Sequence, residues 1–264
     1  MYYIQDDYKI ARMVEQIVSI GEMMLTSGSD VSRVEDSIRR MCDAIGAHRT
    51  EVFSITSTII VSVYFKDRAP ITQTRRIRGM SYNLNRLEQL NALSREIVAK
   101  ANTPEEFQSC SLHQRVVRIR TEHEYNWKYR MLFYALISSS FSVFFGGSPL
   151  DAISSAVIGA LICIFEKFIK CFDINPFITS FDVSLFGGVM AYLFVFVGFG
   201  NSFDRISIGN IMVLIPGLQL TNGLRDMFAG DTITGLTRTI EACLQSMIIA
   251  LGFILAGHLI GFFV

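Results

Sequence analysis

Apolar residues near the start of the chain recur at helical spacing in two runs that glycines separate. The first run lies on one helix face and ends at Gly28 (Ile10, Val14, Ile17, Val18, Met24 and Leu25). The second follows a cap at Asp30 or Ser32 and ends at Gly46 (Val34, Ile38, Met41 and Ile45). The pattern predicts two amphipathic helices joined by a tight turn.

The following residues change from a strand pattern back to a helix pattern. Residues 52–65 are dense in β-branched and aromatic residues, which predicts one or two strands, and the more polar residues 71–78 predict a third strand at a sheet edge. Leucines between residues 84 and 97 return to helical spacing. Thr103, Pro104 and Glu106 form a capping box that predicts another helix starting near Pro104.

Long apolar runs dominate the rest of the chain. Tyr125, Trp127 and Tyr129, interleaved with cations, form an interfacial anchor before the first run. Judged against the roughly 20 residues that a helix needs to cross a bilayer, the runs predict five spans. These spans cover about residues 131–147, 150–168, 176–199, 206–220 and 240–263. The predicted fold class is therefore an α-helical polytopic membrane domain of about five transmembrane helices (residues 125–264), preceded by a cytosolic α/β domain (residues 1–124).

Charge supports this division. Residues 1–130 hold 19 of the 24 Lys and Arg and 16 of the 24 Asp and Glu. The formal net charge of zero is therefore the sum of +3 in residues 1–130 and −3 in residues 131–264. Cations near the predicted spans gather on one side, which predicts a cytoplasmic N-terminal domain and an extracytoplasmic C-terminus. Residues 1–7 contain two acids and do not have the pattern of a secretory signal.

Two arginine clusters, at residues 75–78 and 115–120, are nearly balanced by acids, so we interpret them as facing solvent or anionic lipid headgroups and expect no nucleic-acid partner. Five cysteines without a CxxC pair indicate reduced thiols, and no metal site is predicted. P-loop, GxGxxG, GxSxG and HExxH motifs are absent, so we expect no catalytic residues and no cofactor.

Polar residues inside the predicted spans are the first functional candidates. Asp182 lies about two turns into the third span, where a carboxylate costs roughly 2.5 to 3.5 kcal/mol near the bilayer centre. It therefore needs a partner, a proton or an aqueous cavity, unless it sits shallow at the interface or caps a neighbouring helix. In the last span, Glu241 and Gln245 are one helical turn apart and extend a polar stripe inward.

The fourth span carries the most informative pattern. Pro216 and Gly217 predict a helix break within an apolar stretch. An interrupted helix presents an N-terminal end that favours a substrate carboxylate, although a simple proline kink with solvated polar neighbours is the alternative. The predicted substrate-binding residues of this region are Asn210, Pro216, Gly217, Gln219, Asn222, Arg225 and Asp231. Arg225 is expected to pair with Asp226, with Asp231 or with the substrate.

Three stretches of the chain resemble the bacterial threonine/serine exporter family. They are GEMMLTSGSDVSRVEDSIRRMCDAIG, NLNRLEQLNALSREI and IPGLQLTNGLRDMFAGDTITGLTRTIEACLQSMIIALG, and together they extend the match over most of residues 15–255. The resemblance implies export of small carboxylate-bearing metabolites across the bacterial inner membrane. Family members of this length look like the larger subunit of two-component systems, including ones associated with succinate export.

An odd number of predicted spans without an internal repeat fits a chain that needs a smaller integral membrane partner. The expected function is export of threonine, serine or a dicarboxylate such as succinate. Small residues at four-residue spacing, such as Ala152, Ala156 and Ala160, favour packing within the bundle over a homo-oligomer face. The alternative is a membrane-tethered regulator or sensor whose function lies in the front domain, and a tethered enzyme ranks third.

Overall fold

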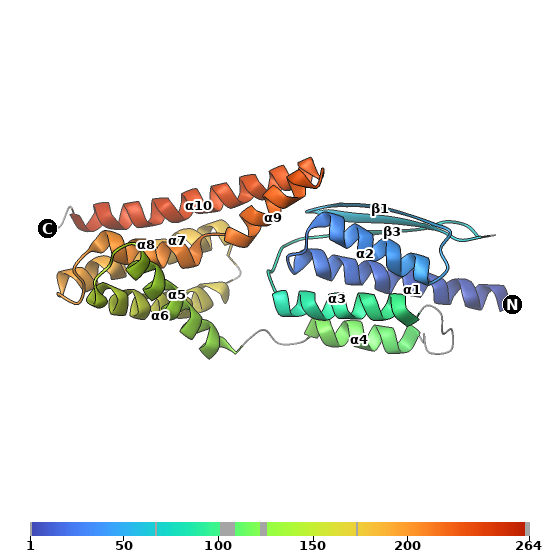
Figure 1. Cartoon of the computed structure of the whole chain (residues 1–264), viewed down its shortest axis with the longest axis horizontal. Helices are drawn as coiled ribbons and strands as arrows, with labels where there is room; N and C mark the ends of the chain where they lie inside the picture. The colour runs from blue at the N-terminus through green and yellow to red at the C-terminus, as the bar shows by residue number, and fades with distance from the viewer. Residues whose placement is uncertain (1, 67, 101–108, 122–125, 173, 262–264) are drawn as a thin grey trace. The chain divides into compact units, whose positions relative to one another are not determined.

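The computed structural model describes residues 2–66, 68–100, 109–121, 126–172 and 174–261 (Figure 1). The chain divides into two compact units. The front unit comprises Met1–Glu124 together with Leu218–Thr239, and the back unit comprises Tyr125–Gly217 together with Ile240–Val264. A segment from late in the sequence thus belongs to the front unit. The functional division at residues 124 and 125 stays a prediction.

The front unit contains four helices and one antiparallel sheet among its described residues before Glu124. The predicted helices, the two strands of residues 52–65 and the edge strand are confirmed, whereas the predicted helix start at Pro104 lies outside the described residues. The sheet has the order β1-β2-β3. The elements are α1 (Tyr2–Thr26), α2 (Val31–Ala44), β1 (Arg49–Ile55), β2 (Thr58–Tyr64), β3 (Ile71–Arg76), α3 (Leu84–Ala99) and α4 (Ser109–Thr121).

One face of this sheet closes the core of the front unit. Ile59, Val61 and Val63 alternate along β2 and are fully buried with the apolar faces of α1 and α2, whereas Phe53 on the other face is 57% exposed. Helices α3 and α4 pack on the side of α1 that lies away from the sheet (Figure 1). The arrangement therefore has three layers, with α1 and α2 in the middle.

The turn between α1 and α2 requires a glycine. Gly28 has φ of 105°, a left-handed conformation that residues with a Cβ rarely adopt. The N–H of Ser29 donates to the carbonyl of Met24, and the N–H of Ser27 donates to that of Met23, which satisfies the last carbonyls of α1. This turn positions the residues Ser29, Asp30 and Val31 at the start of α2.

The remaining helices are α5 (Trp127–Phe144), α6 (Pro149–Lys170), α7 (Pro176–Phe196), α8 (Phe203–Leu214), α9 (Gly217–Phe228) and α10 (Thr232–Gly261). Ser148 and Asp151 form a capping box around Pro149 at the start of α6, and Asn175 caps α7 before Pro176. Both starts agree with the spans predicted from residues 150 and 176. The last helix starts earlier than the predicted residue 240. Its first turns, with α9, belong to the front unit.

Small residues allow the helices of the back unit to approach closely. A Cβ added at Gly209 of α8 would lie 2.5 Å from the carbonyl oxygen of Ser138 on α5, and one added at Gly252 of α10 would lie 2.0 Å from Oγ of Ser184 on α7. Large apolar side chains such as Phe144, 78% exposed, cover the outside. Close contacts between small residues and exposed apolar surfaces are typical of helices packed within lipid.

The predicted fold class of about five transmembrane helices preceded by a cytosolic α/β domain is wrong. The described part of the chain has ten helices and only one small three-stranded sheet, and three of those helices are long and apolar enough to cross a membrane, namely α6, α7 and α10. The expected fourth span, residues 206–220, is two helices of 12 residues, each about 18 Å long, against roughly 30 Å of hydrocarbon. The expected first span, residues 131–147, lies mostly in α5, whose first turn contains Lys128 and Arg130 and whose apolar run is diluted by four serines.

Candidate functional site

A break at Pro216 separates α8 from α9, as the sequence predicted. Ile215 takes an extended conformation, with φ of −60° and ψ of 131°, because a residue before proline is hindered from the helical one. Helix α9 then runs to Phe228, and a turn at Gly230, with φ of 98°, leads into α10. This reversal sets α9 beside the first turns of α10 within the front unit.

Glycines hold α9 and α10 in close contact. A Cβ added at Gly235 would lie 2.6 Å from the backbone nitrogen of Met227 and from the carbonyl oxygen of Gly223, and one added at Gly223 would lie 2.6 Å from Oγ1 of Thr239. Because backbone atoms occupy these positions, no side chain fits without separating the helices. The α9–α10 hairpin, residues 217–239, is therefore a tightly packed element.

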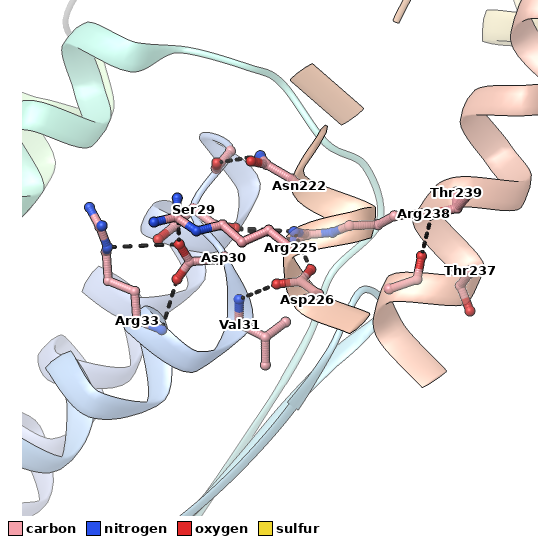
Figure 2. A network of polar contacts seen from close by, with 12 residues as sticks. Ser29, Asp30, Val31, Arg33, Asn222, Arg225, Asp226, Thr237, Arg238 and Thr239 are labelled. Carbon is pink, nitrogen blue, oxygen red and sulfur yellow. Dashed lines mark hydrogen bonds and ion pairs between the residues drawn. The ribbon is translucent and has the colours of Figure 1, made fainter. Parts of the chain in front are cut away.

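The hairpin binds the α1–α2 turn through residues that the sequence placed in a substrate site. Asn222 donates from Nδ2 to the carbonyl of Gly28 at 2.9 Å, and Nη1 of Arg225 lies 3.2 Å from Oδ2 of Asp30 (Figure 2). Arg225 is 61% exposed at its side chain. Its partner is thus Asp30, which was not among the partners expected from the sequence.

A buried ion pair lies beside these contacts. Nη1 of Arg238 is 2.7 Å from Oδ2 of Asp226, and the two side chains are 1% and 0% exposed. The other carboxylate oxygen of Asp226 accepts the N–H of Val31 at 3.1 Å, and both terminal nitrogens of Arg238 donate to the carbonyl of Ser29 at 3.3 Å (Figure 2). Burial raises the pKa of Asp226, while Arg238 and the N–H of Val31 act in the opposite direction.

Two carboxylates therefore meet the N-terminus of α2. Asp30 is the N-cap of α2 and accepts a hydrogen bond from the N–H of Arg33 at 2.9 Å. Asp226 from α9 accepts one from the N–H of Val31, the first residue of α2. A helix N-terminus favours negative charge because its first N–H groups have no partner within the helix. We call the set of Asp30, Asp226, Arg225 and Arg238 the hairpin network.

Sequence reasoning missed the central pair of this network. From the sequence, Asp226 was considered only as one possible partner of Arg225, and Arg238 only as one of the cations near the predicted spans. The available signal was the position of Arg238 in a largely uncharged stretch, TITGLTRTI, where a cation needs a partner. Its partner lies 12 residues earlier, across a turn, so helical spacing could not identify it.

Several of the predicted residues lie in the back unit. Asp182 of α7 is half-buried and has no hydrogen-bond or ion-pair partner among the described residues. Asn210 of α8 is fully buried; its Nδ2 donates to the carbonyl of Ile206 at 2.9 Å, and its Oδ1 has no partner in the described part of the chain. Gln245 of α10 donates to Oγ of Ser180 on α7 at 3.3 Å.

The ten predicted substrate-binding residues are divided between the units. Asn222 and Arg225 come together in the hairpin network, and Gln219 and Asp231 are half-buried elsewhere in the same hairpin. The back unit holds the other six, Asp182, Asn210, Pro216, Gly217, Glu241 and Gln245. Glu241 is half-buried on α10. We therefore treat the hairpin network and the polar residues of the back unit as separate groups.

Helices with lipid-type packing and exposed apolar surfaces define an α-helical membrane protein. The model of the ThrE family, described as "Putative threonine/serine exporter", matches residues 15–260, and the chain belongs to this family. The resemblance seen in the sequence is thereby confirmed. The family is described as one of exporters.

The chain is also similar to individual family members. The "Threonine/serine exporter" of Corynebacterium glutamicum is 22% identical over 91% of this chain and 50% of its own length. The "Probable threonine/serine exporter" of Mycobacterium tuberculosis is 22% identical over 95% and 47%. The chain thus spans about half the length of these exporters. The "Probable succinate transporter subunit YjjP" of Escherichia coli is 22% identical over 90% of this chain and 91% of its own length. No solved structure matches the chain.

Proposed function

We propose that this chain is one subunit of an exporter that moves threonine, serine or a small dicarboxylate such as succinate out of the cell, together with a smaller integral membrane subunit. The support for a partner is the name of a relative: the chain covers 91% of the E. coli protein that is named as a transporter subunit. We place the protein in the bacterial inner membrane, with its N-terminus in the cytoplasm and its C-terminus outside.

The observation that carries this proposal is the presence of polar groups without protein partners in the back unit. Asp182 is unpaired among the described residues, and the buried Oδ1 of Asn210 accepts no hydrogen bond there. Leaving such groups unsatisfied costs several kcal/mol in a lipid environment. A transported solute or a proton would satisfy them during turnover, whereas helices that only anchor a regulator have no use for them.

The helix break supports a carboxylate as the recognised group. Pro216 ends one helix and Gly217 begins another, at the break that the sequence predicted. Helix N-termini favour anionic groups, and interrupted helices are used in this way by many transporters. Amino acids and dicarboxylates share the carboxylate that such an end would bind.

Efflux of labelled threonine, serine and succinate from cells tests the proposal directly. The chain is expressed alone and with a small membrane partner from its genomic neighbourhood, and insertion of both is checked in membrane fractions. We expect efflux of one solute only when both chains are present. No efflux of any solute with both chains inserted would refute the exporter and favour the membrane-tethered regulator.

A variant pair locates the function in the back unit. Asp182→Asn should reduce efflux at least tenfold while leaving insertion intact, because it removes an intramembrane charge that has no structural partner. Asp204→Asn, the same change at an exposed position on α8, is the matched control and should transport normally. Wild-type efflux by Asp182→Asn would remove that residue from the mechanism.

A further inference from the structure

The front unit contains a cavity of about 460 Å³ that no part of the proposed transport pathway uses. Residues of α1, β3, α3 and α4 line it, and its volume lies within the range of roughly 300 to 1,000 Å³ that small-molecule sites occupy. Its lining is mostly polar, with three arginines and two glutamates. A cavity of this kind can recognise a charged small molecule.

Two of the arginines already have partners inside the protein. Nη2 of Arg75 is 3.0 Å from Oε1 of Glu15, and Nη2 of Arg120 donates to Oγ of Ser19 at 2.8 Å. These contacts neutralise one glutamate and fix two guanidinium groups at the cavity wall. The remaining arginine and glutamate of the lining are Arg86 of α3 and Glu22 of α1.

Arg86 and Glu22 face the same cavity without pairing. Neither side chain has an ion pair among the described residues, although the charges are opposite. The Nε atom of Arg86 is buried and has no acceptor in the described part of the chain, and the same holds for Nε of Arg75. A buried N–H of a charged group without an acceptor is unfavourable, and Arg86 has no carboxylate partner among the described residues, so the cavity favours a negatively charged ligand group.

We propose that this cavity binds a small α-amino acid as its zwitterion. The ligand carboxylate accepts hydrogen bonds from the terminal guanidinium nitrogens of Arg86, and its ammonium group binds Glu22. Met23, Val116 and Val117 supply an apolar wall for the side chain. A dicarboxylate or phosphate would satisfy the arginines but would place a second negative charge beside Glu22, which disfavours it.

This site is independent of the polar residues of the back unit. Asp182, Asn210 and Gln245 belong to another compact unit, and none of them lines the cavity. The front unit would then act as an amino-acid receptor in a membrane exporter. The proposal therefore goes beyond the proposed function, and either can fail without the other.

Calorimetry on the full chain in lipid nanodiscs tests the proposal, with L-serine and L-threonine as probes. Ethanolamine lacks the carboxylate of serine and 3-hydroxypropanoate lacks its ammonium group, so neither should bind. Arg86→Gln and Glu22→Gln should each raise the Kd of L-serine about tenfold or more, since each removes a charge-assisted contact. Arg86→Lys, which keeps the charge, should lose less.

Matched controls separate this site from general damage and from transport. Arg95→Gln and Glu88→Gln change exposed residues of the same helix α3 and should leave the Kd unchanged. Asp182→Asn should bind L-serine as the wild type does. The proposal is overturned if neither amino acid binds, or if Arg86→Gln and Glu22→Gln bind like the wild type. Binding lost in Asp182→Asn alone, or succinate binding that exceeds that of L-serine, would overturn it as well.

Discussion

Breaking the buried pair between Asp226 and Arg238 should release the α9–α10 hairpin from the α1–α2 turn. Arg238→Met removes the partner of a carboxylate that is 0% exposed and leaves the carbonyl of Ser29 without two donors. Removing one member of a buried ion pair costs about 3 to 5 kcal/mol, because the remaining charge stays buried. At about 1.36 kcal/mol per factor of ten, hairpin opening should become two to nearly four orders of magnitude more frequent.

Arg225 provides the matched comparison within the same network. Its ion pair with Asp30 has an ordinary distance of 3.2 Å, but the arginine side chain is 61% exposed. Exposed pairs contribute about 0 to 1 kcal/mol, so Arg225→Met should raise the opening frequency no more than about fivefold. The contrast between the two arginines isolates burial as the cause.

Hydrogen exchange of the backbone amides in residues 217–239, measured in nanodiscs, reports hairpin opening. We expect loss of protection in Arg238→Met, near wild-type protection in Arg225→Met, and recovery in the double variant Asp226→Leu with Arg238→Met, which leaves no charge buried. Equal protection in the two single variants would refute the reasoning, because burial would then not determine the free-energy cost of losing one arginine of an ion pair.

Three further predictions follow from particular contacts. Pro216→Ala should impair efflux by allowing α8 and α9 to join, and wild-type efflux would make the break incidental. Gly235→Ala should destabilise the hairpin by about 1 to 3 kcal/mol in hydrogen exchange, whereas Gly217→Ala, which has no atom within 4 Å of the added methyl, should not. Arg115 lowers the pKa of Glu96 to about 2. The ion pair between these two residues therefore stabilises the packing of α3 on α4 above pH 4.5, and this stabilisation is lost as the pH falls toward 2. Exchange in α4 should therefore rise over that range in the wild type but not in Arg115→Gln.

Local chemistry allowed many elements of this protein to be predicted. Gly28 and Asp30 marked the turn between the first two helices, Ser148 and Pro149 marked the start of α6, and Pro216 marked the break before α9. Each of these residues acts on its own backbone through a restricted φ angle or a hydrogen bond to a nearby N–H. Such effects depend on neighbours in the sequence.

The number of membrane spans was predicted less well. Counting apolar runs included the segment around Pro216, which hydropathy treats as continuous although its two helices are each too short to span. It also included α5, in which Lys128 and Arg130 occupy the first turn. Span counting fails here because apolar composition does not report where a helix begins and ends.

The sequence by itself determined the family, the strongly apolar back half, the helix caps and the break at Pro216, because each depends on composition or on residues adjacent in the chain. Only the tertiary structure decided that residues 218–239 join the front unit and that Asp226 and Arg238 pair beside Val31. It also decided that Arg86 and Glu22 share a cavity without meeting. These outcomes depend on contacts between residues that are far apart in the chain. Which residues come into contact is determined by packing and by the free-energy cost of burying an unpaired charge.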